Sequence, residues 1–280
     1  LNAIKNIDFN VWAYTPSEGT LAYRKKLTEY YNKLGYNITP ENILVTVGGS
    51  EAITIAMQTC VNEGDEIIIP EPFYANYNGF ACMSNVVVKP ILSYIENGFA
   101  LPPIAEFEKL ITEKTKAIII CNPNNPTGSI TSGKELMDFC SRVSEKVPVF
   151  IDEAYIELAE GTGTESMVSL LSKNKNVIIA RTFSKIMGMA GVRVGYIAAL
   201  PSFLEGINKI TRGGMGISFT SIAAASAAIA GQRDSRCRPE SPRPRQRVRL
   251  VRTSGQSSAR TAPCPSARAG RRPCRRSAGR

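Results

Sequence analysis

Short apolar runs alternate with amphipathic segments along most of the chain. The apolar runs, many of them β-branched, predict seven strands at 43–47, 66–69, 86–89, 116–121, 147–151 and 177–180, with a last one that ends at residue 199. Segments with helical spacing predict helices at 21–34, 51–61, 70–83, 103–111, 132–145, 201–211 and 218–230, with a short helix before residue 177. This alternation predicts a three-layer α/β fold, in which helices cover both faces of a seven-stranded, mostly parallel sheet.

Beyond Gly231 the pattern stops and the composition changes. Residues 232–280 contain 15 Arg, no Lys and two acidic residues, a net charge of +13, whereas residues 1–231 carry −3. Large apolar side chains are rare there, so burial cannot offset the entropy of ordering this Arg/Pro/Ser-rich tail, and we expect disorder. A nucleic-acid-binding arm is the functional alternative, although no aromatic residues interleave with the arginines. A third interpretation, which we favour, is translation of a GC-rich gene in a wrong frame.

The rest of the sequence divides into an irregular segment and one domain. Residues 1–19 do not begin with Met and are interpreted as a truncated N-terminal segment, and 20–231 as the domain. No apolar run reaches 18 residues and no signal peptide opens the chain, so we expect no membrane span and no secretion. The cysteines of the domain lie in apolar or helical patterns, which indicates buried thiols in a reducing cytoplasm. The absence of His excludes His-based triads and His-ligated zinc, and no metal site is expected.

The stretch from Arg181 to Tyr196 follows a predicted buried strand and contains Lys185. Hydroxyl groups flank this lysine, and Arg193 and several glycines follow it. A Schiff base to an aldehyde cofactor that carries a phosphate needs this combination, because the amine forms the covalent bond while hydroxyls, amides and an arginine hold the phosphate. A basic loop between two strands is the alternative, and this stretch alone does not decide between them.

Other unusual residues also follow predicted strands, where ligands bind in parallel α/β sheets. Gly48-Gly49-Ser50 stands between a strand and a helix and can hold a phosphate through helix N-terminal amides and a hydroxyl, although many strand–helix turns look alike. Asp152 ends a strand, where it caps the next element or pairs with a cation such as a protonated pyridine nitrogen. Tyr155 can hydrogen-bond a ring substituent or be a half-buried loop tyrosine. Tyr74, after two prolines, can stack on a flat ring or pack in the core.

The segment Asn122-Pro-Asn-Asn-Pro-Thr-Gly128 is more specific, because two prolines fix a rigid loop that presents Asn side chains. Together with Gly48-Gly-Ser-Glu-Ala52, Asp152-Glu-Ala-Tyr155 and Ser184-Lys185, it resembles the fold-type I, pyridoxal-phosphate-dependent aminotransferases of classes I and II. The resemblance covers about residues 14–230 and implies the large domain of that family, with the small domain largely missing. The sequence up to about Asn125 is most similar to aspartate aminotransferases. The sequence from about Val147 onward is more similar to histidinol-phosphate aminotransferases.

The resemblance implies a role for each matched residue. Lys185 forms the internal aldimine and moves the proton, Asp152 pairs with the pyridine nitrogen, and Tyr155 hydrogen-bonds the phenolic oxygen of the ring. These three are the implied catalytic residues. The cofactor-binding set contains them and Gly49, Ser50, Tyr74, Asn125, Thr182, Ser184, Arg193 and Tyr14. Tyr14 matches a tyrosine that reaches the phosphate of the neighbouring subunit, which implies a homodimer.

The implied function is transfer of an amino group between an amino acid and a 2-oxo acid, with pyridoxal 5'-phosphate as cofactor. The donor is of the aspartate or the histidinol-phosphate type, and the truncation is expected to impair activity. The enzymatic alternative is another fold-type I reaction on the same cofactor, such as decarboxylation, elimination or acyl transfer. The non-enzymatic alternative is an inactive cofactor-binding remnant with a basic tail.

Overall fold

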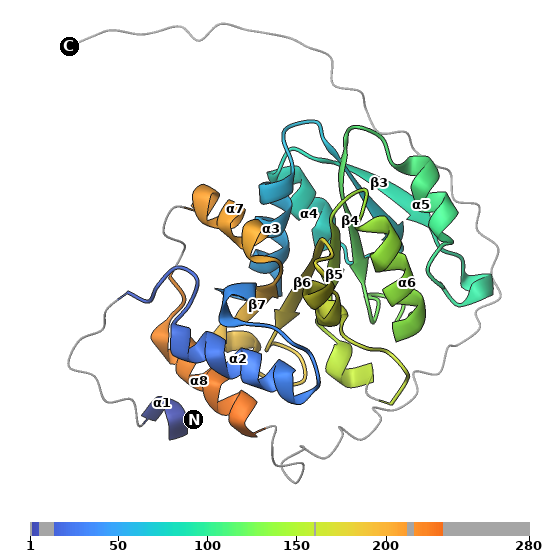
Figure 1. The fold of residues 1–280 in the computed structure, drawn as a ribbon. Coiled ribbons are helices and arrows are strands. Elements are labelled where there is room, and N and C mark those ends of the chain that lie inside the picture. Colours follow the sequence, from blue (N-terminus) through green and yellow to red (C-terminus); the bar gives the residue numbers. More distant parts are fainter. Residues whose placement is uncertain (1, 6–13, 160, 212–215, 232–280) are drawn as a thin grey trace, which may run out of the picture. The chain divides into compact units, whose positions relative to one another are not determined.

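A single sheet forms the centre of the computed structural model, which describes residues 2–5, 14–159, 161–211 and 216–231 (Figure 1). Its strands are β1 (Ile43–Thr46), β2 (Glu66–Glu71), β3 (Val87–Leu92), β4 (Thr115–Cys121), β5 (Val149–Asp152), β6 (Val177–Thr182) and β7 (Gly195–Ala198). Their order is β1-β7-β6-β5-β4-β2-β3. Strand β7 runs antiparallel to β1 and β6, and the other neighbouring pairs are parallel. The seven-stranded, mostly parallel sheet is therefore confirmed.

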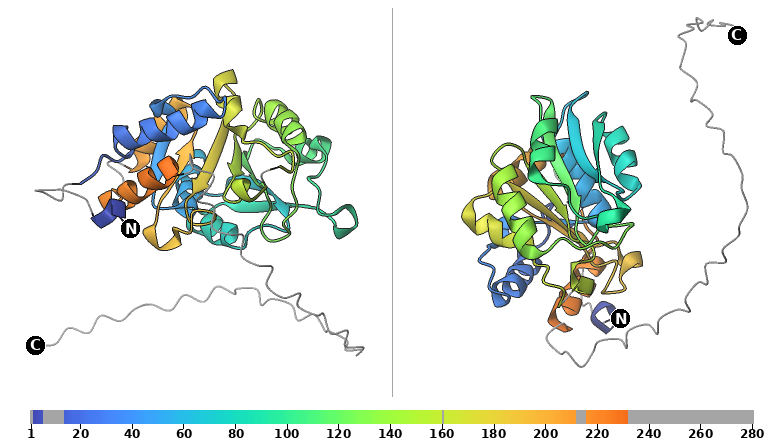
Figure 2. Two further views of the ribbon diagram at one scale, coloured as in Figure 1. Left: turned by 90° about the horizontal axis from the view of Figure 1, so that it is seen from below. Right: turned by 90° about the vertical axis from the view of Figure 1, so that its right-hand side faces the viewer.

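Helices cover both faces of this sheet, which gives the three expected layers (Figure 1 and Figure 2). One layer consists of α3 (Gly49–Cys60), α4 (Asn76–Met83) and α7 (Pro201–Thr211). The other consists of α2 (Leu21–Lys33), α5 (Ile104–Leu110), α6 (Gly133–Val143), α8 (Phe219–Gly231) and the 3-10 segment η4 (Met167–Lys173). The remaining described elements are α1 (Asn2–Lys5) and the 3-10 segments η1 (Pro40–Asn42), η2 (Ile95–Asn97), η3 (Ile156–Ala159) and η5 (Ala190–Val192). The predicted tail, 232–280, lies outside the described residues.

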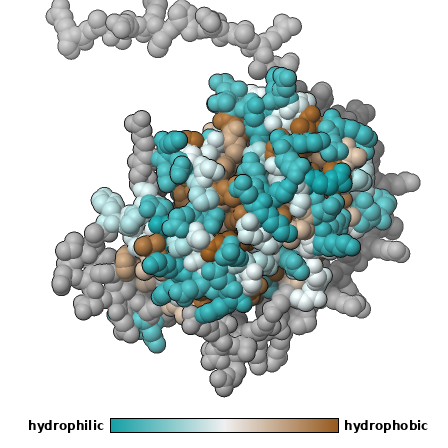
Figure 3. Space-filling model, viewed as in Figure 1, coloured by the Kyte–Doolittle hydropathy of each residue, from teal (hydrophilic) through white to brown (hydrophobic). Residues whose placement is uncertain are grey.

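The central strands separate two apolar cores. In β4, Ala117 and Ile119 belong to the core under α3 and α4, whereas Ile118 and Ile120 belong to the core on the other face, and all four are buried. Two-sided burial explains why these strands read as continuous apolar runs rather than alternating ones. The face seen in Figure 3 is mostly hydrophilic, with apolar residues scattered between polar ones.

Two predicted boundaries are wrong in ways that matter for the site. The structure extends β2 through Pro70 and Glu71, which pair with β3, and begins α4 only at Asn76 instead of at residue 70. The reason is that a residue before proline avoids the helical region, so Glu71, before Pro72, stays extended. Helix α3, in turn, begins at Gly49 rather than at residue 51. The first shift leaves Tyr74 in the loop between β2 and α4, and the second places Gly49 and Ser50 in the first turn of α3.

Strand β7 approaches the turn after β1 so closely that it requires glycine. A Cβ atom added to Gly195 would lie 2.5 Å from the carbonyl oxygen of Arg181 and 2.8 Å from the carbonyl carbon of Gly48. Both obstacles are backbone atoms, which cannot rotate away as a side chain can. The close packing of β6, β7 and the β1–α3 turn therefore depends on Gly195.

We expect Gly195→Ala to lower the free energy of unfolding by about 1–3 kcal/mol, because the added methyl group overpacks two backbone segments. Gly191→Ala is the matched control, since nothing lies within 4 Å of a Cβ added there, and its effect should stay within about 0.5 kcal/mol. Urea unfolding followed by circular dichroism measures both variants. Equal stability of the two would contradict the close approach.

Candidate functional site

A cavity of about 250 Å³ opens at the carboxyl ends of the central strands, beside the N-terminus of α3. Ten of the eleven residues predicted to bind a cofactor line it: Gly49, Ser50, Tyr74, Asn125, Asp152, Tyr155, Thr182, Ser184, Lys185 and Arg193. The parallel strands bring these residues together from four separate sequence motifs and from Tyr74, which belongs to none of the four. Tyr14 does not line the cavity, and its side chain is 98% exposed.

One end of the cavity is a cradle of backbone amides, hydroxyls and a guanidinium. Gly48 precedes the first turn of α3 with a φ of 134°, and a Cβ atom there would lie 2.6 Å from Nη2 of Arg193. The guanidinium therefore lies directly against the glycine, and Nη1 of Arg193 donates to the carbonyl oxygen of Ala190 (2.8 Å). The first turn of a helix has N–H groups without intrahelical partners, so this end of the cavity favours an anion.

Two hydroxyl groups line the same end from β6 and the loop that follows it. Oγ1 of Thr182 donates to Oγ of Ser184 (2.9 Å) and accepts the backbone N–H of Ser184 (3.1 Å). This local bonding turns the chain sharply just before Lys185. The hydroxyls and the lysine are thereby presented to the cavity by one tight turn.

Asp152 lies at the end of β5 and faces the middle of the cavity. Its carboxylate accepts hydrogen bonds from the hydroxyl of Tyr77 (2.8 Å) and from the backbone N–H of Ala154 (3.0 Å). Burial raises the pKa of Asp152, while these two hydrogen bonds and the positive charge of Lys185 oppose the rise. The two hydrogen bonds thus fix the position of the carboxylate, and a cation in the cavity stabilises its charged form further.

Tyr77 lines the cavity and bonds Asp152, and the sequence did not reveal it as a residue of this site. It lies on α4 with 0% exposure, 75 positions before Asp152 in the sequence. A tyrosine in the buried position of a helix does signal that its hydroxyl needs a partner. Nothing local to α4, however, identifies that partner as Asp152.

Lys185 and Tyr155 contact each other across the cavity. Nζ of Lys185 lies 4.8 Å from the centre of the Tyr155 ring, and Nδ2 of Asn125 donates to the Tyr155 hydroxyl (3.2 Å). Hydrogen bonding with Tyr155 is the main cause that raises the pKa of Lys185, and the charges of Tyr155, Tyr74 and Asp152 add to it, against some desolvation. The lysine side chain is nevertheless exposed to the cavity and accessible to a ligand.

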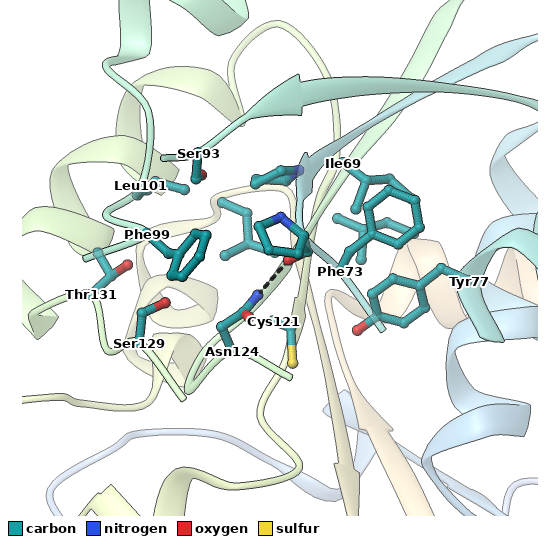
Figure 4. A pocket seen from close by; sticks show the side chains of 14 residues that line it. Ile69, Phe73, Tyr77, Ser93, Phe99, Leu101, Cys121, Asn124, Ser129 and Thr131 are labelled. Atoms are coloured by element: carbon teal, nitrogen blue, oxygen red, sulfur yellow. Dashed lines mark hydrogen bonds between the residues drawn. The ribbon is translucent and has the colours of Figure 1, made fainter. Parts of the chain in front are cut away.

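The asparagine-rich loop uses its three Asn side chains differently. Asn122 donates to the carbonyl oxygen of Thr131 and to Thr164, so it holds the loop together. Asn124 donates to the carbonyl oxygen of Pro72 (3.2 Å), across a small neighbouring cavity that shares Tyr77 with the site (Figure 4). Of the three, Asn125 alone lines the larger cavity. The hydrogen bonds of Asn122 and Asn124 explain the rigid loop that the motif predicted.

Tyr74 lines the cavity just before α4. Its ring meets that of Tyr77 edge to face at 5.6 Å, and its hydroxyl accepts a hydrogen bond from Asn76 (2.7 Å). These contacts fix the ring at the wall of the cavity. Its stacking on a ligand stays a prediction.

The fold and the cavity together define an α/β protein with a lysine, a carboxylate and an anion cradle at the ends of its strands. The chain belongs to the family described as aminotransferase class I and II, whose profile matches residues 6–254. Histidinol-phosphate aminotransferase 2 of Carboxydothermus hydrogenoformans is 34% identical over 217 residues, which cover 77% of this chain and 57% of that protein. The histidinol-phosphate aminotransferase of Staphylococcus haemolyticus is 35% identical over 221 residues, covering 78% and 60%. The chain spans about three fifths of the length of these relatives.

Solved structures share this architecture. An aspartate aminotransferase of Thermus thermophilus with maleate aligns with a TM-score of 0.73 at 26% identity, covering 80% of this chain and 59% of that one. BacF from Bacillus subtilis aligns with a TM-score of 0.75 at 24% identity, which supports the fold alone. The predicted resemblance to fold-type I aminotransferases is confirmed. Over the part of the chain that the structure describes, no helix has the length and apolar character needed to cross a bilayer.

We expect Asp152→Asn to stabilise the cofactor-free protein progressively as the pH rises. The pKa of Asp152 is raised in the folded state, so the unfolded chain releases this proton first, from about pH 4. The wild-type protein therefore loses stability as the pH rises through the folded-state pKa, and the uncharged variant does not. Urea unfolding between pH 4 and 8 measures the difference between the two proteins.

Asp138→Asn is the control for this series, because Asp138 lies on α6 with a side chain that is 65% exposed. Its difference from the wild-type protein should change little with pH. A wild-type protein that gains stability over Asp152→Asn with rising pH would contradict the expectation, because it would show that the hydrogen bonds and Lys185 stabilise the charged carboxylate by more than burial destabilises it.

Proposed function

We propose that the cavity binds pyridoxal 5'-phosphate and that the protein transfers an amino group between an amino acid and a 2-oxo acid. The observation that carries this proposal is the lining of one cavity by Lys185, Asp152 and the Arg193 cradle. Each offers what a different part of the cofactor requires: an amine for the aldehyde, a carboxylate for the ring nitrogen and an anion site for the phosphate. Membership of the aminotransferase class I and II family supports the same conclusion.

The cradle fits a phosphate group. The absence of a side chain at Gly48 leaves room for the guanidinium of Arg193, because a Cβ atom at residue 48 would lie only 2.6 Å from Nη2 and would clash with it. The amides of the first turn of α3 and the hydroxyls of Ser50, Thr182 and Ser184 would then donate to phosphate oxygens. A charged acceptor suits this donor-rich end of the cavity.

The middle of the cavity fits an aromatic ring that carries a protonated nitrogen and an oxygen substituent. Asp152 would accept from the ring nitrogen, held in position by Tyr77, while Tyr155 and Asn125 would bond the ring oxygen. When bound, such a ring supplies an electron sink that stabilises negative charge on the carbon next to the amino group. The half-buried carboxylate would keep the nitrogen protonated through its negative charge. Burial raises the pKa of Asp152, but the hydrogen bonds from Tyr77 and Ala154 and the charge of Lys185 oppose that rise and favour the ionised form.

Lys185 would bind the aldehyde through Nζ and later hold or deliver a proton at that same atom. Its amine is protonated in the cofactor-free protein, since contact with Tyr155 raises its pKa. Binding therefore requires loss of a proton from Nζ.

The donor is proposed to be histidinol phosphate or aspartate, two of the substrates named among the relatives and solved structures. We further propose a homodimer in which Tyr14, exposed and outside the cavity, reaches the phosphate of the second copy; a monomer in sedimentation would contradict this. Of the four described cysteines, Cys121 and Cys140 are buried as predicted, but Cys60 is half-buried and Cys82 is exposed, so the prediction is wrong for these two. All four are free thiols, which supports work in the reducing cytoplasm.

The test is a half-reaction followed by absorption. The protein loaded with pyridoxal phosphate should convert to the amine form of the cofactor when aspartate, glutamate or histidinol phosphate is added. Borohydride reduction before addition of the donor should fix the cofactor to Lys185, as read by peptide mass spectrometry. Lys185→Ala should abolish the adduct, and Lys209→Ala, which alters an exposed lysine of α7, should not. Conversion by none of the donors would refute aminotransfer, and no adduct would refute the cofactor.

Arg193→Ala should weaken binding of pyridoxal phosphate by about 10- to 100-fold, the effect of losing a hydrogen bond to a charged group. Binding of unphosphorylated pyridoxal should change little, because it lacks the group that the guanidinium holds. Arg142→Ala removes an exposed arginine of α6 and serves as the control. Fluorescence titration measures the affinity of the wild-type protein and of each variant for both ligands. An equal loss for both ligands would mean that Arg193 supports the fold rather than the phosphate.

A further inference from the structure

A second polar cluster lies behind the site, on the opposite face of the sheet. Its centre is Arg181 on β6, whose side chain is 5% exposed. Its guanidinium pairs with Glu153 (3.0 Å) and with Glu157, and it donates to the hydroxyl of Tyr31 (3.3 Å). Thr182, the next residue, lines the cavity on the other face. The cluster is therefore one residue away from the site but not part of it.

The two glutamates flank Tyr155 in the sequence. Glu153 comes two residues before it and Glu157 two residues after it, at the start of η3. The backbone between them turns tightly, with the N–H of Ile156 donating to the carbonyl oxygen of Glu153 (3.3 Å). One guanidinium thus holds both ends of a five-residue arch, 153–157, and Tyr155 stands at the middle of that arch, facing Lys185.

The two ends of the arch are held unequally. Glu153 is 1% exposed and also accepts hydrogen bonds from Oγ of Ser166 (2.8 Å) and the N–H of Met167 (2.8 Å). The side chain of Glu157 is 18% exposed and forms an ion pair with Arg181. Neutralising Glu157 leaves Arg181 paired with Glu153, so the fold should tolerate this change while the second half of the arch is released.

We propose that Glu157, acting through Arg181, is a positioning residue that holds the Tyr155 hydroxyl and ring against the amine of Lys185. The inference rests on the proposed function only for the chemical role of Lys185. The contact between Lys185 and Tyr155 does not depend on that role. Tyr155 is held from two sides: Asn125 bonds its hydroxyl and the Arg181 cluster fixes its backbone. Release of one side loosens the contact with the lysine.

The charge environment of Lys185 makes this contact measurable. The titratable groups that act on its amine are Tyr155, Tyr74 and Asp152, and Arg193 and Cys121 line the same cavity. Of these groups, Tyr155 alone belongs to the arch held by Arg181. A change at Glu157 that acts by position must therefore reach Lys185 through Tyr155.

The experiment measures the rate at which an amine-acylating reagent modifies Lys185 in the cofactor-free protein, by peptide mass spectrometry between pH 6 and 10. Only the unprotonated amine reacts, so loss of the Tyr155 contact should shift the rate profile to lower pH. We expect Glu157→Gln to raise the rate at pH 8 by about two- to tenfold, the equivalent of one net hydrogen bond. Tyr155→Phe should raise it similarly, and the double variant should add no further rise.

Glu145→Gln is the matched control, because it neutralises a glutamate that pairs with Lys175 at the surface, and its profile should equal that of the wild type. An unchanged Lys185 profile in folded Glu157→Gln, even with a lower melting temperature, would overturn the proposal, as would additive effects in the double variant. Should Glu157→Gln fail to fold, Glu157→Asp replaces it. We expect Glu157→Asp to raise the acylation rate of Lys185 by a smaller factor, and an unchanged rate would again contradict the proposal. Failure of the borohydride adduct at Lys185 would refute the proposed cofactor without altering these rates.

Discussion

The register of the three central strands is the constraint on which the site depends. Cys121 on β4 pairs with Asp152 on β5, and Asp152 pairs with Ala180 on β6. Because side chains alternate between the faces of a strand, this line of pairs directs Asp152 to the cavity and its neighbour Glu153 away from it. A slip of one residue would exchange the two carboxylates and bury the wrong one in each core. The apolar residues before them are buried on both faces, so the two carboxylates, each with its partners on one face only, are what makes such a slip unfavourable.

The same alternation divides the polar groups into two sets with different tasks. Glu153 and Arg181 lie among the apolar residues of one face, where a lone charge would be strongly destabilising, and each is the other's partner. Asp152 and Thr182 face the cavity, where their bonding capacity is open to a ligand. The ion pair on one face thus fixes the backbone that presents Asp152 and Thr182 to the cavity on the other face. A buried ion pair adds little net stability by comparison with apolar residues, so its better explanation here is that it fixes position.

The helices and strands could be predicted because they depend on local periodicity. The predicted boundary between β2 and α4 was wrong because a second local effect, the conformational restriction before proline, outweighed the periodicity. Pro72 extended β2 and delayed α4, a consequence of steric restriction before proline that the amphipathic pattern concealed. The site residues could be predicted because each follows a strand and resembles a known motif. Tyr77 and Arg181 could not, since their partners lie 75 and 28 positions away in the sequence and only tertiary packing brings them together.

Two tyrosines control the two ionisable groups of the site in opposite senses. The hydroxyl of Tyr77 donates to Asp152 and so opposes the rise of that pKa. Tyr155 acts on Lys185 and raises its pKa, which favours the charged amine. Both tyrosines therefore stabilise charges that burial alone would suppress. They come from different elements, α4 for the one and the 153–157 arch for the other, so a change in one need not disturb the second.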